Sequence, residues 1–421
     1  MTVTLKRQYL HGEIDVITSK SAAHRIMICA AAASRSVKIF GLNNSADVDA
    51  TRRCLTALGA RFKDTADGGC ITEPIALSET KNNGESVILN CGESGSTLRF
   101  LLPFVSALGV TAEFHTEGRL SERPTDELIR LLTLHGADIS KDGAVIKSRG
   151  ALRAGEYTVS GKVSSQFTSG LLMALPLVKG KSAIIQDGAM ASKGYIDITL
   201  GVLKKFGADI TSDGGVYHID GGKVYCAPES ITVEGDWSNA AFFVVAGAAA
   251  GDITINGLDT ESKQPDKEIL TLIRRMGGDI SVVDGRVRVG KSRLKGIEID
   301  AENIPDIVPV LSVAAGTARG RTVIYNAGRL RLKESDRLET VAAMLNKCGG
   351  RAAIDGDKLI IDGVDSYRGA VVDSFNDHRI AMSAAVLSLS AQTPVTITNA
   401  EAVNKSYPDF FEKFKGLYGQ D

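Results

Sequence analysis

Six segments of the chain share one pattern, in which a polar start precedes a long run of small apolar residues. The segments begin at Lys20, Gly92, Ser164, Trp237, Pro305 and Asp377, so successive starts lie 68 to 73 residues apart. A strand-like run such as "SVKIF" follows each segment, and an Asp then marks the beginning of a second helix. Five of the second helices end at a Gly, before two alternating strands around a Gly turn. Each repeat therefore predicts helix, strand, helix, strand, strand, with one more strand leading to the next repeat.

The repeats also predict how the chain divides into domains. The sixth repeat lacks its closing strands, whereas residues 1–19 are strand-like and have no partner at the start of the chain. We expect the N-terminus to complete the sixth repeat, so that residues 1–19 with 235–421 form one domain and residues 20–234 form the other. The predicted fold class is α/β (α+β): two globular domains of three βαβαββ-type repeats each, with buried parallel helices in an inside-out α/β barrel. Two chain crossings predict a hinge, with the ligand site in a central cleft.

Composition limits the classes of partner. A formal net charge of −1 over 421 residues argues against a protein that binds nucleic acid mainly by charge. No apolar run approaches the length of a membrane span, and the strand-like start has no signal sequence, so we expect a cytoplasmic protein without a membrane partner. The six cysteines have no CxxC spacing and the histidines no metal-ligand spacing, so we expect reduced thiols and no metal.

The starts of the apolar helices are where we expect function. A buried helix has unpaired amides and partial positive charge at its N-terminus, which attracts anions. Ser94, Ser238 and Asp377 are adequately explained as helix caps, and a lone His378 as a packing residue. Basic residues at helix N-termini oppose the dipole, and their repeated occurrence favours a functional explanation. These residues are Lys20, Arg119, Lys333, Arg379 and Lys405.

Two carboxylates among these cations indicate proton transfer. Asp306 and Glu334 would be misplaced in a site that only binds anions. Lys333 and Arg337 are four residues apart and are expected to share a helical face. The residue pattern therefore predicts a site for ligands with several phosphate and carboxylate groups.

The chain resembles the 5-enolpyruvylshikimate-3-phosphate synthase family over residues 18 to 411. The matching motifs, in chain order, include "SKSAAHR", "CGESGSTLRF", "GRLSERP", "SSQFTSGLL", "SKGYIDITL", "IPDIVP", "RLKESDRL", "NDHRIAMS" and "NKSYPDFF". The resemblance implies transfer of the enolpyruvyl group from phosphoenolpyruvate to shikimate 3-phosphate with release of phosphate. It also implies a monomer whose partners are these two substrates, with no cofactor.

The resemblance further implies residue roles. For phosphoenolpyruvate the implied binding residues are Lys20, Gly95, Arg119, Gln166, Arg337, Arg379 and Lys405. For shikimate 3-phosphate they are Ser21, Arg25, Ser164, Ser165, Gln166, Ser192, Tyr195, Asp306 and Lys333. Asp306 is expected to accept the proton of the 5-hydroxyl, while Lys20 and Glu334 share the proton transfers at the methylene carbon and His378 assists. The division of roles among these last three residues stays open.

Two departures from the family pattern and three alternatives remain. Glu93 stands where members commonly have Asn, and Arg329 where some relatives have Asn. The sister enolpyruvyl transferase acting on UDP-N-acetylglucosamine has a Lys-Asn pair and a loop Cys, whereas this chain has Lys20-Ser21 and no Cys in "EGRLSERP". A non-catalytic anion-binding protein would not need Asp306 and Glu334. An RNA-terminal phosphate cyclase would need stronger basic character.

Overall fold

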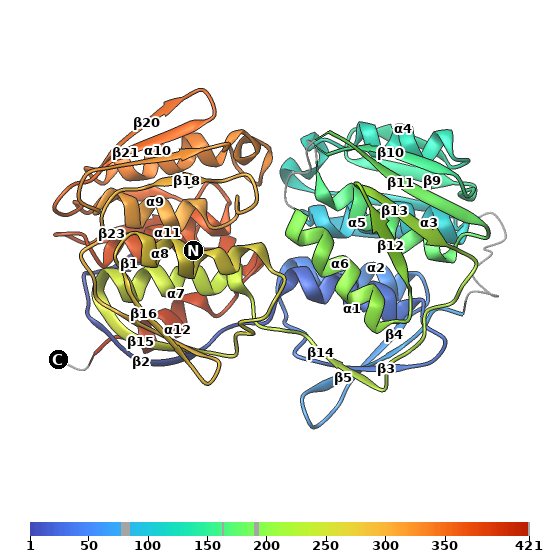
Figure 1. Ribbon diagram of the computed structural model, residues 1–421, viewed down its shortest axis with the longest axis horizontal. Helices are drawn as coiled ribbons and strands as arrows, with labels where there is room; N and C mark the ends of the chain where they lie inside the picture. The colour runs from blue at the N-terminus through green and yellow to red at the C-terminus, as the bar shows by residue number, and fades with distance from the viewer. Residues whose placement is uncertain (77–84, 162–163, 189–192, 420–421) are drawn as a thin grey trace. The chain divides into compact units, whose positions relative to one another are not determined.

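The computed structural model describes residues 1–76, 85–161, 164–188 and 193–419. The chain divides into two compact units, each with its own hydrophobic core. Unit 1 contains Met1–Ile17 and Glu234–Asp421, and unit 2 contains Thr18–Val233. Three repeats of helices and small mixed sheets form each unit (Figure 1), which confirms the predicted fold class.

The first helix of each repeat lies in the core of its unit. These core helices are α1 (Lys20–Ala31), α3 (Gly95–Leu108) and α5 (Ser165–Ala174) in unit 2, and α7 (Trp237–Ala250), α9 (Val308–Gly316) and α11 (His378–Ser388) in unit 1. Within each unit the three core helices contact one another. Every residue of α9 and α11 is buried, as expected for helices that are apolar on all sides.

Small residues let the core helices pack closely. A Cβ atom at Gly170 of α5 would lie 2.5 Å from the carbonyl oxygen of Arg99 in α3, closer than real side chains approach. A Cβ atom at Gly247 of α7 would likewise lie 2.9 Å from Cβ of Val289 in the neighbouring sheet. Burial of one large apolar side chain in such a core contributes about 1.5–3 kcal/mol.

The second helices lie outside the core helices, and several follow a short 3₁₀ turn. They are α2 (Ala46–Ala57), α4 (Asp126–Leu134), α6 (Lys193–Lys205), α8 (Ile269–Arg275), α10 (Arg337–Lys347) and α12 (Phe410–Gly416). The 3₁₀ turns are η1 (Gly118–Glu122), η2 (Leu175–Leu177), η3 (Pro265–Glu268), η4 (Gly328–Leu332) and η5 (Ala400–Lys405).

These turns correct part of the sequence prediction. Arg119 lies in η1, Lys405 ends η5, and Lys333 follows η4 with extended backbone. The prediction that these three cations stand at α-helix N-termini is therefore wrong, whereas Lys20 begins α1 and Arg379 is the second residue of α11. Lys333 and Arg337 do not share a helical face either, because α10 begins only at Arg337.

Among the described residues, each unit contains three sheets, and all of these except the three-stranded sheet of unit 1 share one strand order. In unit 2 the sheets are β14 (Ser230–Thr232), β3 (Val37–Phe40), β5 (Gly69–Glu73), β4 (Arg61–Asp64); β6 (Val87–Gly92), β7 (Ala112–Thr116), β9 (Val145–Arg149), β8 (Asp138–Asp142); and β10 (Glu156–Ser160), β11 (Lys181–Asp187), β13 (Val216–Asp220), β12 (Ile210–Asp213). In unit 1 they are β2 (Leu10–Asp15), β15 (Gly251–Asn256), β17 (Arg286–Gly290), β16 (Asp279–Val283); β18 (Glu298–Asp300), β19 (Arg321–Tyr325), β21 (Lys358–Asp362), β20 (Arg351–Asp355); and β22 (Val371–Asp373), β23 (Val395–Thr398), β1 (Val3–Leu5). The first two strands of each set are parallel and the remaining pairs are antiparallel.

The N-terminal strands enter two different sheets. β1 pairs antiparallel with β23 and so adds to the sixth repeat, as predicted. β2 instead pairs in parallel with β15 of the fourth repeat, and β14 pairs in parallel with β3 of the first. Hence the strand that precedes α1 belongs to unit 1 and the strand that precedes α7 belongs to unit 2. The predicted domain boundaries already placed residues 1–19 and 20–234 in different domains. What the sequence prediction missed is that β2 joins the fourth repeat, because it assigned the whole N-terminus to the sixth.

In the described ranges, no helix has both the length and the apolar character of a membrane span. All six cysteines are free thiols, and each of them except Cys226 is buried.

Candidate active site

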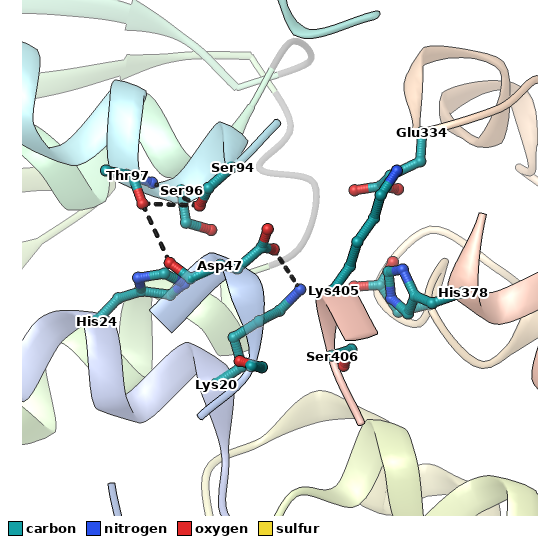
Figure 2. A network of polar contacts seen from close by, with 12 residues as sticks. Lys20, His24, Asp47, Ser94, Ser96, Thr97, Glu334, His378, Lys405 and Ser406 are labelled. Carbon is teal, nitrogen blue, oxygen red and sulfur yellow. Dashed lines mark hydrogen bonds and ion pairs between the residues drawn. The ribbon is translucent and has the colours of Figure 1, made fainter. Parts of the chain in front are cut away.

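Lys20 begins α1 and is held by a carboxylate of unit 2. The hydroxyl of Ser19 caps α1 by accepting from the amide of Ala22 at 3.3 Å. The Lys20 Nζ atom lies 2.7 Å from Oδ2 of Asp47 near the start of α2, and the two side chains are 15% and 13% exposed. Figure 2 shows this pair. Asp47 therefore offsets the cost of placing a cation at a helix N-terminus.

A chain of hydrogen-bonded side chains joins α1, α2 and α3 of unit 2. His24 Nδ1 lies 2.7 Å from the hydroxyl of Thr51, which lies 2.7 Å from the hydroxyl of Thr97. Thr97 donates in turn to the hydroxyl of Ser94, the cap of α3, at 2.7 Å (Figure 2). Burial of the ring, together with the charge of Lys20, holds the pKa of His24 well below its usual value. The imidazole is therefore neutral near pH 7 and fixes α1, α2 and α3 without adding charge.

Gln166 is oriented by two groups from α3. Its Oε1 accepts from Nη1 of Arg99 at 2.7 Å, and its Nε2 donates to the hydroxyl of Ser96 at 2.9 Å. Arg99 also donates to the carbonyl of Pro124 at 3.2 Å and is only 5% exposed. These bonds fix the amide plane of Gln166.

Gly95 leaves room for a guanidinium group at the start of α3. A Cβ atom at Gly95 would lie 2.9 Å from Nη1 of Arg123 and 3.1 Å from Nη1 of Arg99. The structure therefore brings Arg123 against the α3 N-terminus. Arg119 has a 49% exposed side chain, and its Nε lies 3.6 Å from Oε2 of Glu122.

Arg25 is buried and holds two of the other predicted residues by their backbones. Its guanidinium donates to the carbonyl of Ser21 at 2.6 Å and to that of Tyr195 at 3.0 Å. It also donates to the hydroxyls of Thr199 and Ser169 and lies over the ring of Phe100. Arg25 therefore ties α1 to α5 and α6.

The remaining predicted residues of unit 2 are at the start of α5 and before α6. Ser164 caps α5 by accepting from the amide of Gln166 at 3.2 Å, and Ser165 is buried behind it. Ser192 lies outside the described residues. Glu93 lies against Gly118, where a Cβ atom would come within 2.7 Å of Cδ of Glu93. Its carboxylate thus packs on the turn that carries Arg119 and Arg123.

In unit 1, Arg337 is the centre of a cluster of carboxylates. Its side chain is 1% exposed. Nε lies 2.8 Å from Oδ2 of Asp377, Nη1 lies 2.7 Å from Oδ1 of Asp306, and Nη2 lies 2.7 Å from Oε2 of Glu334. Burial alone would lower the pKa of Arg337, but the three carboxylates outweigh it and raise the pKa above its usual value.

Asp306 is shared between two cations. Nζ of Lys333 lies 3.0 Å from the same Oδ1 that accepts from Arg337. Burial favours the neutral acid, yet the charges of Lys333, Arg337 and Arg379 hold the pKa of Asp306 well below its usual value. Asp306 is therefore a carboxylate at neutral pH.

Arg379 contacts the beginning of α7. Its Nη1 donates to the carbonyl of Ser238 at 2.8 Å, and the guanidinium lies over the ring of Phe242. The hydroxyl of Ser238 donates to the carboxyl of the buried Asp266. Burial, together with the negative charge of Asp306, raises the pKa of Asp266 to about 7. The sequence explained Ser238 as a helix cap, but the side chain of Asp236 caps α7, and Ser238 instead connects Arg379 to a second buried carboxyl group.

His378 and Lys405 complete the cluster of charged residues in unit 1 (Figure 2). Nδ1 of His378 lies 3.9 Å from Oδ1 of Asp377, and the His378 side chain is 3% exposed. Lys405 Nζ donates to the carbonyl of Asn376 at 2.7 Å. Unit 1 therefore brings together Asp306, Lys333, Glu334, Arg337, His378, Arg379 and Lys405, all of which the sequence singled out.

Sequence reasoning missed the residues that hold the charged groups in place. Asp47, Asp266 and Asp377 are the acidic partners, and Arg99 orients Gln166. Asp266 was interpreted only as a helix-start marker and Asp47 was not singled out, because an Asp that pairs with a side chain about 27 residues away looks like any other Asp near a helix start. Across the described ranges, no group of three His, Cys, Asp or Glu side chains is arranged to hold a metal ion.

Comparison with known proteins identifies the family. A family model described as EPSP synthase (3-phosphoshikimate 1-carboxyvinyltransferase) matches residues 5–414. A 3-phosphoshikimate 1-carboxyvinyltransferase of Clostridium botulinum is 40% identical over 415 residues, which are 97% of this chain and 96% of the relative. One from Brachyspira hyodysenteriae is 37% identical over 422 residues, covering 99% of each chain.

Solved structures agree on the fold. An EPSP synthase from Acinetobacter baumannii superposes with a TM-score of 0.82 at 26% identity, covering 99% of this chain and 98% of that chain. The enolpyruvyl transferase NikO from Streptomyces tendae, at 18% identity and a TM-score of 0.79, shares the fold. The family model, the curated relatives and the solved structure from Acinetobacter baumannii place the chain in the enolpyruvyl transferase class. The chain belongs to the EPSP synthase (3-phosphoshikimate 1-carboxyvinyltransferase) family.

Proposed function

We propose that the residues around Lys20 and Gln166 in unit 2 and those around Arg337 in unit 1 are two half-sites, which together carry out one reaction. The chain is a transferase of the shikimate pathway, which leads to the aromatic amino acids. It transfers the enolpyruvyl group of phosphoenolpyruvate to shikimate 3-phosphate. Phosphate is released when the group is transferred to the 5-hydroxyl. The observation that carries the residue assignment is the buried cluster of Asp306, Lys333, Glu334 and Arg337, because it combines anion-binding cations with carboxylates.

Phosphoenolpyruvate carries a phosphate and a carboxylate and needs several cations. Lys20, Arg337, Arg379 and Lys405 supply positive charge, and Gln166 supplies an amide held at fixed orientation. The close approach of Arg123 to Gly95 supports Arg123 as a further anion-binding residue. Arg119 has the weaker support, since its side chain is half exposed beside Glu122.

Shikimate 3-phosphate needs hydroxyl donors for its phosphate and acceptors for its ring hydroxyls. Ser164, Ser165 and Ser192 provide the donors, with the amide of Gln166 nearby in the chain. Ser21 and Tyr195 are placed by Arg25, so Arg25 contributes by holding both backbones. Asp306 provides a hydrogen-bond acceptor, and Lys333 a donor, for the ring hydroxyl groups of shikimate 3-phosphate.

The reaction proceeds by addition and elimination. The 5-hydroxyl oxygen of shikimate 3-phosphate forms a bond to C2 of phosphoenolpyruvate, while C3 gains a proton and becomes a methyl group. The tetrahedral intermediate then loses a proton from that methyl group, and the bond from C2 to the phosphate oxygen breaks. The surrounding cations stabilise the departing phosphate.

Asp306 is the residue that accepts the hydroxyl proton. With Lys333 and Arg337 both on Oδ1, its low pKa makes it a weak base in the absence of substrate. Substrate anions that recruit these cations reduce the positive charge at Asp306. The pKa of Asp306 then rises, so the base becomes stronger only when substrates are bound.

Protonation of C3 falls to Glu334 or Lys20. Glu334 is held by Arg337, and Lys20 by Asp47. His378 lies beside Asp377 in the same unit as Glu334 and assists its orientation. We also propose that the chain works in the cytoplasm as a monomer without an added cofactor.

Phosphate release measures this proposal directly. Purified protein is mixed with phosphoenolpyruvate and either shikimate 3-phosphate or UDP-N-acetylglucosamine. We expect phosphate release only with shikimate 3-phosphate. Release with UDP-N-acetylglucosamine alone would show that the sugar nucleotide is the substrate. Release with neither would favour a non-catalytic anion-binding protein. Asp306→Asn should lower kcat by about 10²–10⁴-fold, as expected for a lost general base. Asp355→Asn, at an exposed position of β20, is the matched control and should not change kcat.

A further inference from the structure

Unit 1 contains a cavity at the end of its core helices that the reaction does not use. The cavity has a volume of about 1200 Å³ and is lined by the C-terminal ends of α7, α9 and α11. The candidate catalytic groups Asp306 and His378 belong to the opposite, N-terminal ends of α9 and α11. The cavity is therefore separate from the half-site described above.

Basic side chains outnumber acidic side chains in the lining. Five exposed cations contribute to it: Arg7, Lys291, Arg293, Lys295 and Arg319. Asp365 is the acidic residue in the same lining. Among the described residues, none of the five cations makes an ion pair or a side-chain hydrogen bond. Their charge is thus available to a ligand.

The dipoles of the core helices do not account for this much charge. A helix C-terminus carries about −0.5 charge, so the three ends together carry about −1.5, and Asp365 adds −1. Five cations leave a surplus of about 2.5 positive charges after these are offset. Cations placed only to offset helix ends would not produce such a surplus. A bound molecule with two or three negative charges would neutralise it.

The loops that carry the cations are fixed by main-chain bonds to the helix ends. The amide of Ser292 donates to the carbonyl of Ala248 at 2.9 Å, and that of Val364 donates to Gly316 at 2.8 Å. Arg319 donates from its amide to the carbonyl of Leu294 at 2.8 Å. The backbone positions of the lining are therefore set before any ligand binds, which lowers the entropic cost of binding.

Beneath the cations, the lining of the cavity also includes apolar side chains. Ala250, Val313, Leu389 and the buried Leu294 belong to its lining, and the half-exposed ring of Tyr9 stands at its edge. A lining of this kind favours a ligand with an apolar body as well as charged groups. Inorganic anions alone would leave the apolar surface uncovered.

We propose that this cavity is a second ligand site, which binds a small organic polyanion with an apolar body and two or more carboxylate or phosphate groups. The ligand contacts Arg293, Lys295 and Arg319 with its charged groups and the ends of α7, α9 and α11 with its body. Because it binds the folded unit, it stabilises unit 1. Screening by salt weakens the binding, since the cations are exposed.

Calorimetric titration with simple probes tests the proposal. Benzene-1,3,5-tricarboxylate and phenyl phosphate represent the two kinds of charged group, and benzoate is the monoanion control. We expect the tricarboxylate to bind at least tenfold more tightly than benzoate, and the phenyl phosphate arm shows which group is preferred. At a concentration 100-fold above Kd, the better probe should raise the Tm of unit 1 by about 5–10 °C.

Two variants with equal loss of charge separate this cavity from the active site. The first combines Arg293→Gln, Lys295→Gln and Arg319→Gln. The second combines Lys347→Gln, Arg351→Gln and Lys358→Gln, which are exposed positions of unit 1 outside the cavity.

The cavity variant should lose at least tenfold in affinity for the tricarboxylate and keep the wild-type kcat for phosphate release. The control variant should bind within twofold of the wild type. Equal binding by all three proteins, or no binding by the wild type, would overturn the proposal. If the triple variant does not fold, the single variants Arg293→Gln and Arg319→Gln are compared with Lys347→Gln in the same way.

Discussion

Replacing Arg337 with Gln should destabilise unit 1 far more than removing an exposed arginine. The guanidinium of Arg337 is 1% exposed and bonds to Asp377, Asp306 and Glu334 at 2.7 to 2.8 Å. Asp377 is fully buried, so loss of the guanidinium leaves a carboxylate in the core without its compensating charge. Breaking a buried pair by removing one partner costs about 3–5 kcal/mol, and we expect a loss of that size.

The pH dependence of this loss follows from the carboxylates. In the wild type the pKa of Asp306 is depressed, in part by Arg337. Its contribution to stability is therefore present above the unfolded-state pKa of about 4 and declines as pH falls below it. The variant lacks much of this contribution. The difference in free energy of unfolding should thus be largest near pH 7 and narrow below about pH 4.

Urea denaturation at a series of pH values measures this difference. Arg331→Gln is the matched control, because Arg331 is 34% exposed and pairs with Asp336 and Glu339 at 2.9 and 3.2 Å. An exposed pair contributes about 0–1 kcal/mol, so the control should stay near the wild type. Adding Asp377→Asn to Arg337→Gln should restore part of the stability. If Arg337→Gln loses no more stability than Arg331→Gln, the cluster is not the buried charge centre described here.

Three further substitutions test the two half-sites. Arg123→Gln should raise the KM for phosphoenolpyruvate about 10–100-fold, which is the effect of a lost charge-assisted hydrogen bond. Arg119→Gln should change this KM less than about threefold. Steady-state kinetics in which Arg119→Gln has the larger effect would contradict the assignment. Gly95→Ala should raise the same KM more than that for shikimate 3-phosphate, because its Cβ would lie 2.9 Å from Nη1 of Arg123. The protonated carboxyl of Asp266 stabilises the folded state, and the wild type loses this stability as pH rises from about 4 through about 7 because the pKa of Asp266 is raised. Asp266→Asn does not titrate, so its free energy of unfolding should increase relative to the wild type over this range, by at most about 4 kcal/mol. Urea denaturation at pH 5 and pH 8 measures the effect. The same difference in midpoint between the variant and the wild type at both pH values would contradict it.

The period of the repeat explains why the fold was predictable. Alternation, Gly stops and apolar runs recur in phase, so six weak local signals support one architecture. The repeat that β2 joins was not predictable in the same way. The apolar alternation of a strand is the same whether it pairs with the fourth repeat or with the sixth. Partner choice depends on chain path, which local pattern does not encode.

The candidate site was predictable as far as its cations and carboxylates. Lys20 and Arg379 break the helix-dipole rule locally, which made them visible. Arg123 does not stand out in "GRLSERP", because sequence cannot tell which of two arginines four residues apart contacts Gly95. Asp266 looked like an ordinary helix-start residue and Asp47 was not singled out, because only tertiary pairing shows their partners.

The most direct measurement is a crystal structure of the protein with shikimate 3-phosphate and an unreactive analogue of phosphoenolpyruvate. We predict that one bound ligand pair contacts Lys20 and Arg123 of unit 2 together with Asp306 and Arg337 of unit 1. Ligands held by residues of a single unit would contradict the claim that both half-sites serve one reaction.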